Sequence, residues 1–111
     1  MTEFKFNDRT TSLFEAILSL KSRREAEAFF RDLCTAEELK EMSDRWQMAR
    51  LVAAGEPYRQ IAAELKTSTT TVSRVASWLN NGLGGYRLAL ARLDKKTETA
   101  HHHASFSKKR S

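Results

Sequence analysis

The 111-residue sequence contains little proline, glycine or cysteine: one Pro, four Gly and one Cys. With so few helix-breaking residues, long stretches of the chain are free to form helices. A single cysteine excludes a disulfide within the chain and fits a reducing cytoplasm. No apolar run approaches the roughly 18 to 20 residues that span a bilayer, and the charged residues 3–9 are unlike a signal peptide. We therefore expect a helical, cytoplasmic protein.

Acidic residues are scarce in only one part of the chain. Residues 1–56 hold nine Lys/Arg and eleven Asp/Glu, whereas residues 57–96 hold seven Lys/Arg and only two acids. The formal net charge of +5 is therefore concentrated in the second half. A segment that lies against phosphates is expected to carry such a charge. The alternative is a basic face that is merely solvated.

Residues that would support enzyme chemistry are missing. The three histidines are adjacent, at positions 101–103. Three consecutive histidines in a polar segment are more typical of incidental metal binding or of a tag remnant than of a dedicated metal site. No Ser/His/Asp or Cys/His set is visible elsewhere. The glycine-rich residues 82–85 lack the lysine and the preceding strand of a P-loop. We predict no enzyme activity, no cofactor and no metal site.

The segment Pro57–Asn80 has the apolar spacing of a DNA-binding helix-turn-helix. Two short helices that cross steeply share a small core, which needs a small residue at the crossing and aliphatic residues at fixed distances around it. Here the expected inner faces consist of Ile61, Ala62 and Leu65, followed by Val72 and Val75. This geometry would set the start of the second helix into a major groove. An ordinary αα-hairpin with the same periodicity is the alternative.

Hydroxyl side chains at the start of the second helix, and basic residues near it, are the expected DNA contacts. They are Arg59, Lys66, Ser68, Thr69, Thr70, Thr71, Ser73 and Arg74. Short hydroxyl groups can reach base edges or phosphates but carry little base information alone, so specificity would rely on water or DNA shape. Ser68 or Thr69 also suits the cap of the second helix.

Start and stop signals divide the rest of the chain into further helices. Capping-box patterns begin at Ser12, Ser22 and Thr35 and predict three helices before the helix-turn-helix. A loop over 82–85 precedes a final helix that begins near Tyr86. We therefore predict an all-α fold of about six helices, a helical domain over 1–95 with its helix-turn-helix at 57–80, and a disordered basic, His-containing tail over 96–111. Trp46 and Trp78, at helical positions among apolar neighbours, are expected to pack in the core.

The first two predicted helices carry more large apolar side chains than a lid over the helix-turn-helix needs. They either wrap the core of their own chain or bury against a second copy. We expect a homodimer, whose two-fold axis would place the recognition helices about 34 Å apart, one turn of DNA. The side chains concerned are Phe4, Phe6, Leu13, Phe14, Ile17, Leu18, Leu20, Phe29, Phe30 and Leu33.

Two further motifs, Asp44-Arg45-Trp46-Gln47 and Gly82-Leu83-Gly84-Gly85-Tyr86, carry a family resemblance. With the flanking segments LFEAILSLKSRREAEAFFRDLCT and STTTVSRVASWLNNGLGGY, the chain resembles the Trp-repressor-like family, and especially its YerC/YecD-type branch. The resemblance implies an intertwined all-helical homodimer and a bacterial transcription regulator.

In the tryptophan repressor two arginines flank the bound indole, and by motif Arg45 and Arg74 match them. Arg45 could instead pair with a nearby carboxylate on its own helix. The glycine that follows the second arginine in the repressor is Val75 here, and a serine three positions further on is Trp78. We therefore predict that the chain's own side chains fill the effector pocket and that tryptophan is not a corepressor.

The residues and the resemblance together predict a sequence-specific DNA-binding homodimer, a repressor or other regulator that acts on duplex DNA of the nucleoid. One alternative is a repressor gated by a different small effector at Arg45 and Arg74, recognisable by an apolar cavity between them. The other is a helical interaction adaptor that never binds DNA, recognisable by a weak or absent salt-dependent affinity for duplex DNA.

Overall fold

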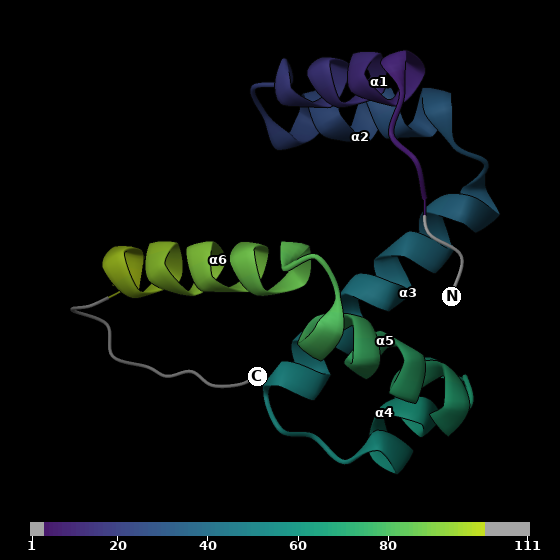
Figure 1. Cartoon of the computed structure of the whole chain (residues 1–111). Coiled ribbons are helices and arrows are strands. Elements are labelled where there is room, and N and C mark those ends of the chain that lie inside the picture. The colour runs from purple at the N-terminus through teal and green to yellow at the C-terminus, as the bar shows by residue number, and fades with distance from the viewer. Residues whose placement is uncertain (1–3, 102–111) are drawn as a thin grey trace. The chain divides into compact units, whose positions relative to one another are not determined.

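The computed structural model describes residues 4–101, which form six α-helices and no strand (Figure 1). The helices are α1 (Asp8–Leu18), α2 (Arg23–Leu33), α3 (Ala36–Ala53), α4 (Tyr58–Leu65), α5 (Thr69–Asn81) and α6 (Gly85–His101). The predicted all-α class is confirmed. Helix α6 continues past Lys95 to His101, so it takes in the first residues of the predicted tail; residues 102–111 lie outside the described part. Within the described range, none of the helices is both long and apolar enough to cross a membrane.

The chain divides into two compact units, Met1–Lys40 and Glu41–Ser111. Helices α1 and α2 belong to the first unit, and α4, α5 and α6 belong to the second. Helix α3 begins in the first unit and continues into the second. The single domain predicted over 1–95 stays a prediction.

Helix α1 begins earlier than the sequence pattern predicted. Its N-cap is Asn7, whose side-chain oxygen accepts from the backbone N–H groups of Arg9 at 2.9 Å and Thr10 at 3.1 Å. The Thr10 hydroxyl accepts in return from the Asn7 N–H at 2.8 Å. The predicted start at Ser12 is wrong, because Asn7 and Thr10 already satisfy the free N–H groups one turn earlier and Ser12 falls inside the helix.

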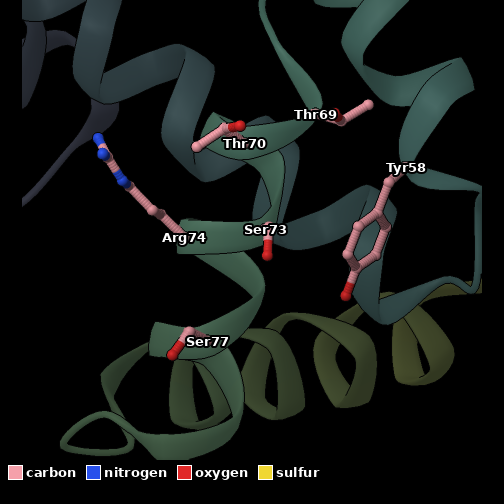
Figure 2. Close-up of a pocket in the computed structure, with 6 residues that line it drawn as sticks. All are labelled: Tyr58, Thr69, Thr70, Ser73, Arg74 and Ser77. Carbon is pink, nitrogen blue, oxygen red and sulfur yellow. The ribbon is translucent and has the colours of Figure 1, made fainter.

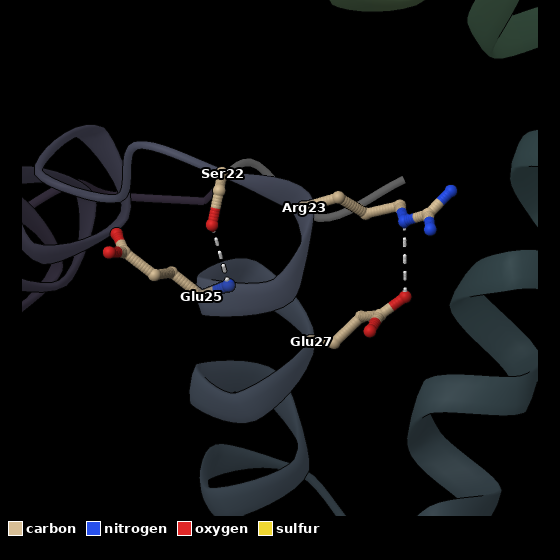
Figure 3. A network of polar contacts seen from close by, with 4 residues as sticks. All are labelled: Ser22, Arg23, Glu25 and Glu27. Carbon is tan, nitrogen blue, oxygen red and sulfur yellow. Dashed lines mark hydrogen bonds and ion pairs between the residues drawn. The ribbon is translucent and has the colours of Figure 1, made fainter.

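The predicted start of α2 is confirmed, with one difference in its hydrogen bonds (Figure 3). The Ser22 hydroxyl accepts from the Glu25 N–H at 3.1 Å, as expected of a cap. The Glu25 carboxylate accepts from the N–H of Lys21 at 2.8 Å. Arg23 and Glu27 form an ion pair at 3.5 Å on the exposed side, which contributes about 0.3 kcal/mol or less.

Helix α3 has the predicted cap at its start and a glycine turn at its end. Thr35 and Glu38 exchange hydrogen bonds of 3.0 and 2.9 Å between side chain and backbone, a complete capping box. After the helix, Gly55 adopts a φ of +89°, which favours glycine. Pro57 then caps α4, where its missing N–H leaves no hydrogen bond unmade.

The core of the second unit lies where α3, α4 and α5 meet. Its buried residues are Met48 and Ala49 of α3, Ile61 and Ala62 of α4, and Val72 and Val75 of α5. This confirms the predicted inner faces of the helix-turn-helix, apart from Leu65, which is half-buried. Trp46 and Trp78 pack against the same cluster, as predicted. The core therefore holds α5 firmly and leaves its opposite face to solvent.

Candidate nucleic-acid interface

The turn between α4 and α5 is short and well bonded. Lys66 ends α4 in the left-handed conformation, with φ 57° and ψ 50°, and the Thr67 N–H donates to the Ala62 carbonyl at 2.9 Å. These features resemble a Schellman-type helix end. The chain reverses within three residues, so the two helices can cross and bury Ala62 between them.

Two of the predicted DNA contacts, Ser68 and Thr71, bond to each other at the start of α5. The Ser68 hydroxyl accepts from the Thr71 N–H at 3.1 Å and lies 3.0 Å from the Thr71 hydroxyl. Ser68 is thus the N-cap, one of the two positions foreseen for that role. Their contact with DNA stays a prediction, but both hydroxyl groups already have a partner in the protein.

The exposed face of α5 forms an open depression of about 470 Å³ beside the start of α4 (Figure 2). Hydroxyl groups and one guanidinium line it: Tyr58, Thr69, Thr70, Ser73, Arg74 and Ser77. We call this surface the hydroxyl-lined depression. Tyr58 and Arg74 lie on opposite sides of it, with Ser73 between them. The structure therefore brings four of the predicted contacts together on one open surface.

Sequence reasoning missed two residues of this surface, Tyr58 and Ser77. Ser77 follows Ser73 by four residues on the same helix and therefore shares its face, so helical spacing would have found it. Tyr58 comes from α4 and is 40% exposed. Its place beside α5 depends on how the two helices cross, which the sequence pattern does not specify.

Of the three predicted basic contacts, one lines the depression and two do not. Arg74 lines it, whereas Arg59 and Lys66 are exposed on α4 and at its C-cap. All three are accessible to a phosphate backbone. Arg59 and Lys66 are suited to contacts that position the protein on DNA, and the hydroxyl groups to contacts with base edges.

The positions compared with an effector site are occupied by packed side chains. Val75 is only 1% exposed and belongs to the core, and Trp78 is half-buried against it. Arg45 is half-buried on α3, and it does not line the depression that contains Arg74. Among the described residues, no group of three His, Cys, Asp or Glu side chains could hold a metal ion.

A helix-turn-helix with a buried crossing and an exposed face of hydroxyl and basic groups is typical of one class of proteins, the DNA-binding regulators. Comparison with known proteins identifies the family. Residues 8–94 match the model of the Trp repressor protein family, and the chain belongs to this family, as its motifs predicted. Members of the family are regulatory DNA-binding proteins and not enzymes.

The relatives cover most of the chain. The uncharacterised protein YerC of Bacillus subtilis (strain 168) is 45% identical over 87 residues, which are 78% of this chain and 83% of YerC. The crystal structure of a TrpR-like protein from Eubacterium eligens matches with a TM-score of 0.76 and 40% identity, over 79% of this chain and 91% of that one. A candidate Trp repressor from Staphylococcus aureus matches with a TM-score of 0.75 and 38% identity, over 80% and 89% of the two chains.

Proposed function

We propose that this protein is a sequence-specific transcriptional repressor that binds duplex DNA as a homodimer and does so without tryptophan. The observation that carries the proposal is the hydroxyl-lined depression on α5, the helix held by the buried Val72 and Val75. Thr69, Thr70 and Ser73 would meet base edges, and Arg74 would meet a phosphate. Such a protein would work in the cytoplasm on the nucleoid.

The exposed apolar side chains of the first unit support the dimer. Helices α1 and α2 contain no buried residue. Phe4 and Phe6 are 63% and 61% exposed, and Leu18 is 83% exposed. Contiguous apolar surface of this kind usually marks an interface, and a second copy with a two-fold axis would give a dimer that matches a palindromic operator.

The packing of Val75 and Trp78 supports action without tryptophan. A ligand that entered beside Arg74 at Val75 would have to displace a side chain that is already buried in the core. Displacing a buried side chain from its packing costs free energy, and that cost would reduce the affinity of any ligand at this position. Isothermal titration calorimetry with L-tryptophan is expected to give no binding heat, and an affinity in the micromolar range would contradict this part of the proposal.

The test of DNA binding is selection of operators from a random duplex library with the purified protein, followed by salt titration of the recovered site. The wild type is expected to recover a palindrome, and the double variant Thr70→Asp/Arg74→Ala to lose it. The affinity of the wild type for the recovered site should fall steeply as the salt concentration rises, because binding releases cations from the phosphates. Both residues are exposed, so the circular dichroism spectrum of the variant should match the wild type.

A different result would redirect the search for function. If no motif is enriched and both proteins are retained equally on DNA, the helix-turn-helix does not read sequence. The helical surface would then serve as a platform for another protein. If a palindrome appears only after a metabolite is added, a small effector bound near Arg45 and Arg74 replaces the unliganded mechanism.

A further inference from the structure

The joint between α5 and α6 is bridged by a hydrogen bond that lies outside the hydroxyl-lined depression. The Arg87 guanidinium of α6 donates from Nη2 to the Asn80 side-chain oxygen of α5 at 2.6 Å. Both residues are exposed, so neither polar group needs this bond to compensate for burial. A hydrogen bond with a charged donor is among the stronger ones, and this one ties together two helices at seven residues' separation.

The backbone of the joint is also restricted. A Cβ atom at Gly82 would lie 2.4 Å from the carbonyl oxygen of Trp78, which is part of the backbone and cannot rotate away. The Gly82 N–H donates to that same oxygen at 2.8 Å. Gly84 adopts a φ of +90°, a conformation open to glycine. By contrast, a Cβ atom at Gly85 would meet open space.

A third contact holds the first turn of α6. Tyr86 is half-buried and packs against the core of the second unit. Its ring centroid lies 6.2 Å from that of Trp46 on α3, with the ring planes 32° apart. The direction in which α6 leaves the recognition helix is therefore set by three independent features: the Asn80–Arg87 bond, the close approach at Gly82 and the packing of Tyr86.

We propose that this joint sets the distance between the two DNA half-sites, with Arg87 as a positioning residue that acts through Asn80. This inference rests on the proposed homodimer. Leu88 and Leu93 of α6 are 51% and 49% exposed, and a dimer would bury them against the second copy. A helix that is anchored in the dimer and rigidly joined to α5 fixes where α5 meets the DNA. The angle at the joint then determines the half-site spacing.

The experiment measures affinity for duplexes in which the spacer between two half-sites changes by one base pair at a time. A duplex with one half-site and a scrambled second serves as the reference. The wild type should prefer one spacing sharply. Arg87→Ala should lower that preference about ten-fold, as expected for the loss of a hydrogen bond with a charged donor. Gly82→Ala should lower it too, because its new methyl group would press on the Trp78 carbonyl and shift the joint. Both should bind the reference duplex as the wild type does, within about two-fold.

Two matched variants complete the design. Arg87→Lys keeps a charged donor and should restore part of the preference. Gly85→Ala adds the same methyl group as Gly82→Ala where nothing obstructs it, and should behave as the wild type. Thermal denaturation checks that Gly82→Ala is folded. If it is not, the comparison of Arg87→Ala with Arg87→Lys still tests the proposal.

The experiment distinguishes failure of the proposed function from failure of this inference. If the wild type recovers no operator, the proposed function fails and this inference falls with it. An operator bound with the same spacing preference by wild type and Arg87→Ala would overturn the joint alone. If Arg87→Ala instead weakens binding to the reference duplex and lowers the salt dependence, Arg87 contacts a phosphate and does not position α6.

Discussion

The two compact units of this chain treat their apolar side chains in opposite ways. In the second unit, residues of α3, α4 and α5 bury one another, and Ile61 and Val72 have no exposed surface. In the first unit, α1 and α2 bury no residue, and exposed phenylalanines of α1 and of the segment before it contact one another. Phe6 lies 5.2 Å from Phe4 and 6.2 Å from Phe14, measured between ring centroids.

This contrast separates two roles within a small chain. The second unit contains what a helix-turn-helix needs to fold: a small residue at the crossing, aliphatic residues around it and a bonded turn. The first unit has amphipathic helices with good caps but no interior of its own. Helices of 11 residues are marginal alone in water, which is consistent with the proposed dimer, where α1 and α2 would gain stability by burying their apolar side chains.

The largest effect is expected from Ile61→Ala in the core of the second unit. Ile61 is fully buried, and removing its side chain should lower the free energy of unfolding by about 3 kcal/mol. Urea denaturation measures this. As a control in the same unit, Leu83→Ala removes a side chain that is 96% exposed and should change stability by less than about 0.5 kcal/mol. Equal effects of the two variants would show that the second unit lacks the core described here.

Phe14→Asp tests the other side of the comparison. Phe14 is 47% exposed and its ring contacts that of Phe6, so an aspartate there would put a charge into the proposed dimer interface. We expect the dimer dissociation constant from sedimentation equilibrium to rise at least about 30-fold, the effect of losing an interface hot spot. Ser12→Asp adds the same charge at an exposed polar position of α1 and should leave the dimer intact. A wild type that is monomeric at micromolar concentration would refute the interface.

Tyr58→Phe separates DNA reading from assembly. The change removes a hydroxyl group from the hydroxyl-lined depression and should weaken operator binding about five-fold, the value of about 1 kcal/mol for one hydrogen bond. The salt dependence should stay unchanged because no charge is lost, and so should the dimer dissociation constant. Ser12→Ala removes an exposed hydroxyl group of α1, outside the depression, and provides the control. If both variants bind as the wild type does, Tyr58 is not a DNA contact.

The sequence predicted the second unit well because its signals are local. Ile61, Ala62, Val72 and Val75 lie within 15 consecutive positions, and their spacing already implies a steep crossing of two helices. The predicted start of α1 was wrong because several nearby residues can each cap a helix, so a local pattern does not decide among them. The pattern beginning at Ser12 met the usual template, whereas the structure uses Asn7 with Thr10 in place of a glutamate.

The parts of the candidate site that escaped prediction depend on tertiary geometry. Tyr58 reaches the depression because α4 crosses α5 at a particular angle. The Asn80–Arg87 bond depends in the same way on the direction of α6. The resemblance to a family indicated Arg45 and Arg74 as the positions to compare with an effector site. The burial of Val75 supports the predicted absence of a tryptophan pocket.

The smallest predicted effect concerns strain at the turn between the two helices. Lys66 is the one non-glycine residue with positive φ among those described, and the left-handed conformation costs such a residue about 1 kcal/mol. Lys66→Gly relieves this strain but gains chain entropy when unfolded, so we expect a net stabilisation of about 0.5 kcal/mol. Asparagine tolerates this conformation better than lysine does, so the stability of Lys66→Asn should lie between those of Lys66→Gly and the wild type. Lys66→Ala should be no more stable than the wild type.

All three variants remove the charge, so if Lys66 contacts a phosphate, each should reduce the salt dependence of operator binding by about one ion. A salt dependence that none of them changes would exclude Lys66 from the DNA contacts, and a glycine variant no more stable than the alanine variant would show that the turn is not strained.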